Sequence, residues 1–481
     1  MTESILQIFF QISQIPRPSR HESGIRDWLM ERSRSNRWEC RTDHALNVLM
    51  EIPPTNDMRH APPVMLQSHS DMVAERDPLS SHNFLTDPIP CYRDGDWVRS
   101  EGTTLGADNG IGMAIALGIA ESTQFAHPLL QLLFTANEEA GMTGIRGLDP
   151  SWLSSPYCIN LDTSSEKGFT VGSAGGASLS VAFPLHYEEA SPELSWFKIL
   201  VSGLRGGHSG GTATRDRLSA LTVLWDVLGS FMPRKDICIQ EIISEHARNA
   251  VSSHAEMTVS LPGDCRGMLE QIIHLTEKQF RTTWRDEHNL VITLEPYTPD
   301  SYRILSRSRQ EALYELGKAM PQGVCAMDSE NEHLPLLSAN WPHIVCSGSK
   351  ASLGISIRGA TADRIHGLIT TLTGAAESLG SVVTKLGEHP PWPERKGSKL
   401  LSCAIDSYQH VEQRPPLCRS IHAGLECGWM HQAAPDMDII SMGAWIEEAH
   451  TPQERLRISS VERTVSVVED IFTCLASRHG K

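Results

Sequence analysis

The chain has 481 residues, about twice the size at which a single hydrophobic core stops growing, so at least two domains are expected. Its formal net charge of −16 and the lack of a lysine- and arginine-rich run argue against nucleic acid, and no segment approaches the roughly 20 apolar residues that span a membrane. Eleven irregularly spaced cysteines without a C-x-x-C pair, together with an N-terminus unlike a secretory signal, indicate reduced thiols and a cytoplasmic protein.

The N-terminal part of the chain alternates helices with short apolar strands. Two helices are predicted on either side of IPRPS, because apolar residues recur there at helical spacing. Strands are expected at LNVLMEI, PPVMLQSH, LLQLLFTA and YCINLD, with a helix at GIGMAIALGIAES. Strands that alternate with helices are typical of an α/β layer structure.

The pattern changes near residue 178. SLSVAFPLHYEE and SWFKILVSGL alternate apolar and polar residues, as half-exposed antiparallel strands do. Further strands and helices follow at NLVITLEPY, SLGISIRG, 215–230, 265–281 and 361–380. This segment therefore predicts a separate α+β domain, which ends near the proline-rich stretch LGEHPPWPERKG.

The last segment returns to a helix–strand–helix pattern, with DIISMGAW as its strand and SSVERTVSVVEDIFTCLAS as a closing helix. The simplest arrangement is one discontinuous α/β domain, with a mixed sheet flanked by helices, formed by residues 1–180 and 390–481. The α+β domain, residues 181–389, would be an insertion in it.

Residues 205–211, RGGHSGG, raise the hypothesis of a serine hydrolase. The embedded GHSGG fits the G-x-S-x-G pattern of a nucleophile elbow, with Ser209 as the nucleophile. An apolar strand precedes it and a helical pattern follows. Asp438 and then His450 come later, in the chain order that such hydrolases use.

A second pattern consists of acids and histidines at the carboxyl ends of apolar strands in the outer segments. Ligands of open α/β sheets bind beyond those strand ends. Each of these positions alone has an ordinary structural explanation. Asp108, for example, could cap the helix that follows it. Together they suit two zinc ions that share one carboxylate, roughly 3.5–4 Å apart. The candidates are His69, Asp71, Asp108, Glu138, Glu139, Asp162 and His450.

Two pairs within this set carry distinct chemistry. His69 and Asp71 fall on the same face of a strand, so the carboxylate can orient the imidazole of a metal ligand. Glu138 and Glu139 are adjacent like charges, which repel unless cations neutralise them. One can hold a metal while the other takes a proton from activated water. A metallohydrolase uses this set of residues, and a serine hydrolase does not.

Several blocks resemble one family in the same order along the chain. LQSHSDMV, EGTTLGADNGIGMA, FTANEEAGMTG, INLDTSSE, GSAGG, GLRGGHSGG and HAGLECG are similar to blocks of the aminoacyl-histidine (cytosol non-specific) dipeptidases. These belong to the di-zinc aminoacylase/carboxypeptidase clan of metallopeptidases. The resemblance covers nearly the whole chain.

The resemblance implies a role for each matched residue. His69 and Asp162 would hold one zinc, Glu139 and His450 the other, and Asp108 would bridge them, with a cis peptide bond from Asp108 to Asn109. Co²⁺ or Mn²⁺ could substitute for Zn²⁺. In further roles, Asp71 would orient His69, and Glu138 would be the general base that deprotonates the bridging water and then protonates the leaving amine.

The resemblance also assigns roles to the inserted domain, as a lid that carries the GGHSGG block and forms a homodimer. His208 would support the oxyanion, commonly at the partner subunit's zinc site, while Ser209 only shapes the turn. A dimer contact could come from edge pairing of strands such as SLSVAFPLHYEE. Asn249 would contact the substrate, and Arg358 its carboxylate.

The leading hypothesis is therefore a di-zinc dipeptidase that acts on unblocked dipeptides, including Xaa-His. A close alternative is a related amidohydrolase that acts on N-acyl amino acids, which would not require a free α-amine. A serine hydrolase that uses Ser209 is a distant alternative. A non-catalytic binding protein on the same scaffold is another, although every expected ligand and the base are present.

Overall fold

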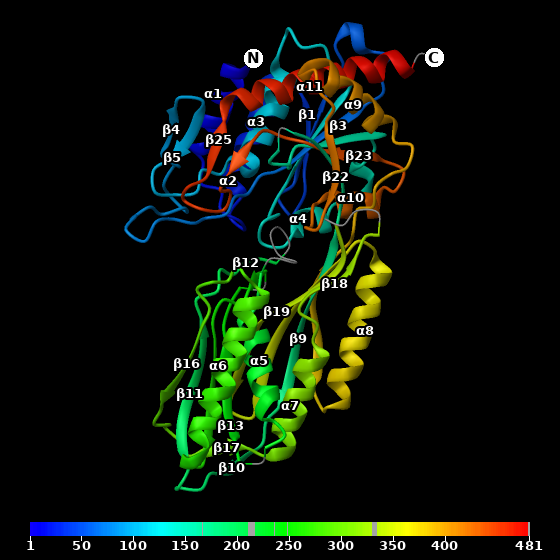
Figure 1. The fold of residues 1–481 in the computed structure, drawn as a ribbon. Coiled ribbons are helices and arrows are strands. Elements are labelled where there is room, and N and C mark those ends of the chain that lie inside the picture. Colours follow the sequence, from blue (N-terminus) through cyan, green and yellow to red (C-terminus); the bar gives the residue numbers. More distant parts are fainter. Residues whose placement is uncertain (166, 210–216, 235, 248, 330–333, 480–481) are drawn as a thin grey trace. The chain divides into compact units, whose positions relative to one another are not determined.

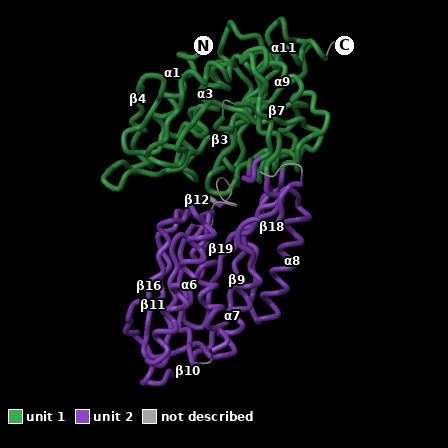
Figure 2. Tube along the Cα trace, in the orientation of Figure 1, with its two compact units in different colours: residues 1–173, 392–420, 425–481 green, residues 174–391, 421–424 purple. Residues whose placement is uncertain are grey.

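The structure, a computed structural model, describes residues 1–481 apart from 166, 210–216, 235, 248, 330–333 and 480–481 (Figure 1). The chain divides into two compact units (Figure 2). Unit 1 comprises 1–173, 392–420 and 425–481, and unit 2 comprises 174–391 and 421–424. The expected boundaries differ from these, because 174–180, 390–391 and 421–424 pack with unit 2.

Unit 1 is built on a mixed sheet with the strand order β1-β2-β6-β3-β7-β23-β8-β22. The neighbours β6, β3, β7 and β23 run parallel, whereas β1, β2 and β8 pair antiparallel. The strands are β1 Glu39–Thr42, β2 Val48–Ile52, β3 Val64–His69, β6 Leu130–Thr135, β7 Tyr157–Asn160, β8 Gly168–Ser173, β22 Leu417–Ile421 and β23 Asp438–Ser441. A smaller sheet has the order β24-β25-β5-β4, formed by Ile446–Glu447, Arg455–Arg457, Trp97–Ser100 and Cys91–Asp94.

Helices pack on this sheet. The helix α3 packs on β3, α9 packs on β23, and α1 and α11 pack on α3. The helices are α1 Thr2–Ser13, α2 Ser23–Asn36, α3 Ala107–Glu121, α4 Thr143–Arg146, α9 Lys399–Glu412, α10 Cys427–Ala433 and α11 Ile458–His479, with 3-10 turns at Asn56–Met58 and Pro150–Trp152. The predicted α/β fold with a mixed sheet flanked by helices is confirmed.

The composition of α3 and its neighbouring strands explains this packing. Every residue of β3 and β6 is buried, as in parallel strands covered on both faces. The helix α3 is rich in small residues, and a Cβ at Gly118 would lie 2.5 Å from Cγ1 of Ile5. The glycine therefore lets α1 approach α3 closely, and together they cover the face of the sheet behind β3.

Unit 2 is an antiparallel sheet with helices α5 to α8 against it (Figure 1). The strand order is β16-β11-β15-β13-β19-β20-β9-β21, and β18 also pairs with β19. These strands are β9 Gly175–Pro184, β11 Ser195–Ser202, β13 Cys238–Ser244, β15 Ala255–Leu261, β16 Val291–Pro296, β18 Gly323–Met327, β19 Pro335–Ser347, β20 Lys350–Gly359 and β21 Val382–His389.

Shorter elements complete unit 2. The helices are α5 Ala220–Phe231, α6 Arg266–Thr283, α7 Arg307–Ala319 and α8 Ala362–Ser378, with a 3-10 turn at Gly263–Cys265. Two separate ribbons pair β10 Tyr187–Glu189 with β17 Arg303–Leu305, and β12 Gly207–His208 with β14 Ala250–Val251. Among the described helices, none has the length and apolarity that a membrane span requires.

The position of β9 corrects one expectation. SLSVAFPLHYEE was expected to offer a free edge for dimer formation, but its main strand, β9, pairs with β20 on one side and with β21 on the other. Its backbone groups are already used by those neighbours, so it cannot extend the sheet. Along the described sheet path the outer strands are β16 and β21.

Candidate metal centre

The carboxyl ends of three neighbouring parallel strands bring most of the predicted residues of unit 1 together. His69 ends β3, Glu138 and Glu139 follow β6, and Asp162 follows β7. In register, His69 lies opposite Thr135 of β6, and Gln67 lies opposite Asn160 of β7. Parallel strands end at the same edge of a sheet, so these side chains meet there. Asp108 comes from the start of α3, and His450 from the loop between β24 and β25.

Asp108 stands between two histidines. Its Oδ1 lies 3.2 Å from Nε2 of His69, and its Oδ2 lies 3.3 Å from Nε2 of His450. His69 Nε2 is also 3.5 Å from Oδ1 of Asp162, and His450 Nε2 is 2.7 Å from Oε1 of Glu139. Two clusters of donor atoms, each within 4.8 Å, therefore share Asp108: His69 with Asp162, and Glu139 with His450.

The donor atoms in these clusters fit metal ions. Glu139 Oε1 is shielded from solvent, and the partner that the structure gives it is Nε2 of His450, at 2.7 Å. Carboxylate oxygens and imidazole nitrogens are ligands that zinc accepts. So many carboxylates in a partly buried site repel one another unless cations balance them.

Asp71 is fully buried beneath the histidine of the first cluster. Its Oδ1 lies 3.4 Å from Nδ1 of His69, and it accepts hydrogen bonds from the backbone amides of Glu138 at 2.9 Å and Glu139 at 3.2 Å. Ser19 Oγ donates to its Oδ2 at 2.7 Å. Burial alone would raise the pKa of Asp71, but the hydrogen bonds, above all from His69, hold it below its ordinary value. The carboxylate thus stays ionised and fixes both the imidazole and the turn after β6.

Glu138 is half-buried beside Glu139. Burial, and next the charge of Glu139, raise the pKa of Glu138 well above its ordinary value. A raised pKa suits a carboxylate that receives a proton during a reaction. His69, Glu138 and Glu139 also form a cluster within 4.8 Å, so the geometry alone leaves Glu138 able to reach a cation near His69.

The turn at Asp108 departs from a regular helix. The peptide bond from Asp108 to Asn109 is cis, as the family resemblance implies, and both residues have non-helical dihedral angles. Asn109 donates hydrogen bonds to Oδ1 of Asp162 at 2.6 Å and to the carbonyl of Leu161 at 3.0 Å. The residue at the cap position of α3 is Gly106, and the carboxylate oxygens of Asp108 lie beside His69 and His450.

The sequence did not point to Glu426, which is fully buried under the site. Its Oε2 accepts hydrogen bonds from Gln67 Nε2 and Thr135 Oγ1, both at 2.6 Å, and burial raises its pKa to about 7. Gln67 also accepts a hydrogen bond from Asn160. These bonds join β3, β6 and β7 just before the strands end. The sequence identifies HAGLECG only as a block that resembles the family. No hydrophobic periodicity around its glutamate indicates that this side chain is buried.

The serine hydrolase hypothesis fails in unit 1. Asp438 accepts hydrogen bonds from Ser398 Oγ at 2.7 Å and from the amide of Leu400 at 3.1 Å, so it holds Ser398, the N-cap of α9, in place. The described partners of His450 are Asp108 and Glu139, and Asp438 is not among them. The triad that the chain order suggested is therefore not assembled by these two residues.

The remaining predicted residues lie in unit 2. His208 forms β12 and pairs in register with Ala250, while its side chain lies outside the described part of the structure. Ser209 is buried, and its amide donates to the carbonyl of Asn249 at 2.6 Å. Asn249 is exposed in the loop before β14. The backbone thus joins the GGHSGG block to the segment that carries Asn249.

Arg358, on β20, lies near the imidazoles of His389 and His422. Its Nε is shielded from solvent, and among the described residues the guanidinium has no hydrogen bond or ion pair. Burial, and next the charge of Arg358, lower the pKa of both His389 and His422 to about 4. His422 Nε2 lies 2.7 Å from Oγ of Ser338, the residue opposite Arg358 in the sheet. Arg358 gives this cluster a positive charge, and no carboxylate among the described residues forms an ion pair with it. Such a charge suits an anionic ligand.

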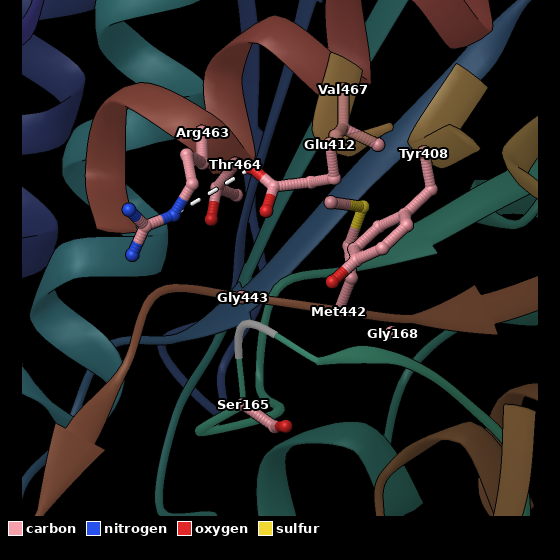
Figure 3. A pocket seen from close by; sticks show the side chains of 9 residues that line it. All are labelled: Ser165, Gly168, Tyr408, Glu412, Met442, Gly443, Arg463, Thr464 and Val467. Atoms are coloured by element: carbon pink, nitrogen blue, oxygen red, sulfur yellow. Dashed lines mark ion pairs between the residues drawn. The ribbon is translucent and has the colours of Figure 1, made fainter. Parts of the chain in front are cut away.

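A small pocket in unit 1 is a different feature. Figure 3 shows its lining side chains, among them Tyr408, Met442 and Arg463, whose Nε lies 3.8 Å from Oε1 of Glu412. The cavity holds about 20 Å³, room for about one water molecule, and none of the candidate ligands lines it. It is too small for a peptide substrate.

Comparisons with known proteins give matches to peptidases along most of the chain. The model of peptidase family M20/M25/M40 matches residues 65–473. The cytosol non-specific dipeptidase of Escherichia coli (strain K12) is 30% identical over 460 residues, 95% of each chain. The crystal structure of aminoacylhistidine dipeptidase from Vibrio alginolyticus is 30% identical, with a TM-score of 0.86 over 98% of this chain and 96% of that one. Human carnosine dipeptidase 1 shares the fold at 14% identity, with a TM-score of 0.53 over 99% and 97%.

Proposed function

Because this chain belongs to peptidase family M20/M25/M40, we infer that it is a metal-dependent dipeptidase that hydrolyses unblocked dipeptides. The observation that carries the proposal is the pair of donor clusters that share Asp108. We propose that His69 and Asp162 hold one zinc ion, that Glu139 and His450 hold the other, and that Asp108 bridges them. Bound in this way, the ions would supply Lewis-acid activation of water and of the scissile carbonyl.

The chain's own residues supply the proton transfers. Glu138 takes a proton from the attacking water and passes it to the amine nitrogen of the leaving amino acid. Its raised pKa and its place beside Glu139 support this role. Asp71 keeps His69 in the orientation in which Nε2 faces Asp108 and Asp162. His208 donates to the oxyanion that forms as the carbonyl is attacked.

Recognition of the substrate's free carboxylate is assigned to Arg358. The unbalanced positive charge of the guanidinium, with His422 and Ser338 beside it, supports this role. Asn249 contacts the substrate. The insertion acts as a lid and joins two chains in a homodimer, and the enzyme works in the cytoplasm, as the name of the E. coli relative states for that protein.

Two changes to the substrate test the proposed specificity. A dipeptide with a free α-amine and a free carboxylate is expected to be cleaved, whereas its N-acetyl derivative is not. Faster cleavage of N-acyl amino acids than of dipeptides would favour the related amidohydrolase instead. The measurement is initial rates for the matched panel on one enzyme preparation.

Replacing Arg358 with methionine tests carboxylate recognition. We expect KM for the dipeptide to rise about 10- to 100-fold, the range for a lost charge-assisted hydrogen bond, while the rate for the corresponding dipeptide amide stays unchanged. Lys350→Met on the same strand is the control, because that lysine is exposed and should leave both substrates unaffected. An equal loss for the dipeptide and its amide would contradict the assignment.

A further inference from the structure

Two buried charged residues of unit 1 take no part in the chemistry described above. Arg17 lies between α1 and α2 and is 2% exposed, and Glu454 lies between β24 and β25 and is 3% exposed. A buried charge is costly unless hydrogen bonds satisfy it. The partners of these two side chains therefore indicate what they do.

Glu454 binds the backbone of the segment that delivers Asp108. Its Oε2 accepts hydrogen bonds from the amides of Leu105 at 2.8 Å and Gly106 at 3.0 Å, and its Oε1 accepts one from the amide of Asp108 at 3.1 Å. The amide of Glu454 itself donates to the carbonyl of Thr451 at 3.0 Å, in the turn directly after His450. One side chain thus links the segment of Asp108 to that of His450.

Arg17 binds the same segment from another direction. Its Nη2 donates to the carbonyl of Gly106 at 2.5 Å, while its Nη1 donates to the carbonyls of Ser70 at 3.1 Å and Asp71 at 2.8 Å, just after His69. Gly106 has a φ of +67°, and a Cβ there would lie 2.8 Å from Nη2 of Arg17. The glycine is therefore needed both for the turn and for the close approach of the guanidinium.

We propose that Arg17 and Glu454 are positioning residues that fix the bridging carboxylate Asp108 relative to His69 and His450 before any metal binds. We call these two side chains and the backbone of 105–108 the brace. It connects three ligand-bearing segments that lie far apart in the sequence. A ligand set held in place binds metal more tightly than one that must be ordered on binding, since the surroundings of ligands typically change affinity 10- to 100-fold. The proposal rests on the metal centre of the proposed function.

Glu454→Gln is the primary test. The amide has nearly the same shape, but it has one acceptor oxygen where the carboxylate has two, and its NH₂ group would face a backbone N–H. We expect the metal-free variant to fold and to bind Zn²⁺ about 10- to 100-fold more weakly, measured by competition with a chromogenic chelator. KM for the dipeptide should be unchanged at saturating metal, and most of kcat should return there.

Glu287→Gln is the matched control. Glu287 is 1% exposed and also accepts a hydrogen bond from a backbone amide, that of Arg205 at 3.0 Å, but it lies in unit 2. We expect this variant to lower the melting temperature of the metal-free protein without changing zinc affinity. An effect of the brace on metal binding is thereby separated from a general loss of stability.

Arg17→Lys provides a second, independent variant, because one lysine nitrogen replaces the two guanidinium nitrogens that bind Gly106 on one side and Ser70 and Asp71 on the other. It should weaken zinc binding in the same range as Glu454→Gln, and it decides the matter alone if Glu454→Gln does not fold. Wild-type zinc affinity in the folded brace variants, or an equal loss in Glu287→Gln, would overturn the proposal. Dipeptide hydrolysis by the wild-type protein is measured separately. If the wild type binds zinc but does not hydrolyse dipeptides, the proposed function fails, while zinc affinity still tests the brace.

Discussion

Glu138→Gln is expected to keep both metal ions and to lose about 10³- to 10⁴-fold in kcat, because it removes the proton acceptor and leaves every proposed ligand in place. The amide of Glu138 still donates to Asp71, so the turn after β6 should keep its shape. The test combines metal content per chain with kcat for a dipeptide at saturating substrate.

Glu139→Gln is the informative counterpart. Glu139 Oε1 is shielded from solvent and lies 2.7 Å from Nε2 of His450, so loss of this carboxylate should weaken metal binding at the His450 site. If Glu138→Gln lost metal while Glu139→Gln kept it, the roles of the two glutamates would be reversed. This reversal is a physical alternative, because ligand atoms of Glu138, Glu139 and His69 also lie within 4.8 Å of one another.

His208→Ala is expected to fold, bind two metal ions and dimerise, while kcat falls about 10²- to 10³-fold, the usual effect of losing an oxyanion donor. Ser209→Ala should stay substantially active, because the buried Ser209 hydroxyl has no described hydrogen-bond partner and its backbone amide keeps the bond to Asn249. Steady-state kinetics on both variants, with metal content and native mass as controls, provide the comparison.

Mixed dimers test whether His208 acts on the partner subunit. A His208→Ala chain combined with a Glu138→Gln chain would create one composite site with an intact base from one chain and an intact histidine from the other. Two inactive homodimers should then give partial activity after exchange. No recovery after verified subunit exchange would mean that His208 serves its own chain or is only structural.

The sequence predicts best those strands for which a local pattern marks both the strand and the residues at its end. The strands β3, β6 and β7 are short apolar runs, and each leads directly into histidine or carboxylates, so both the parallel sheet and the edge at which its ligands meet could be predicted. The helix α3 was recognisable from its apolar pattern and small residues. Its irregular start at Asp108 has no periodic signal and came only from the family resemblance.

The sequence could not predict which distant segments pair with one another. Alternation in β9 predicts a half-buried strand but does not say whether the strand has one neighbour or two, so its interior place between β20 and β21 could not be foreseen. The same holds for the brace. Arg17 and Glu454 lie near opposite ends of the chain, and their burial depends on backbone groups of 105–108 that only the fold brings to them.

Zinc titration of metal-free protein is the most direct test of a shared two-metal centre. Rates of dipeptide hydrolysis and bound zinc per chain are measured on the same samples, after removal of metal with a chelator. We expect no hydrolysis without metal, two ions bound per chain at saturation, and activity that returns with Zn²⁺, Co²⁺ or Mn²⁺. Full activity in rigorously metal-free protein would contradict the assignment of His69, Asp108 and His450 as ligands.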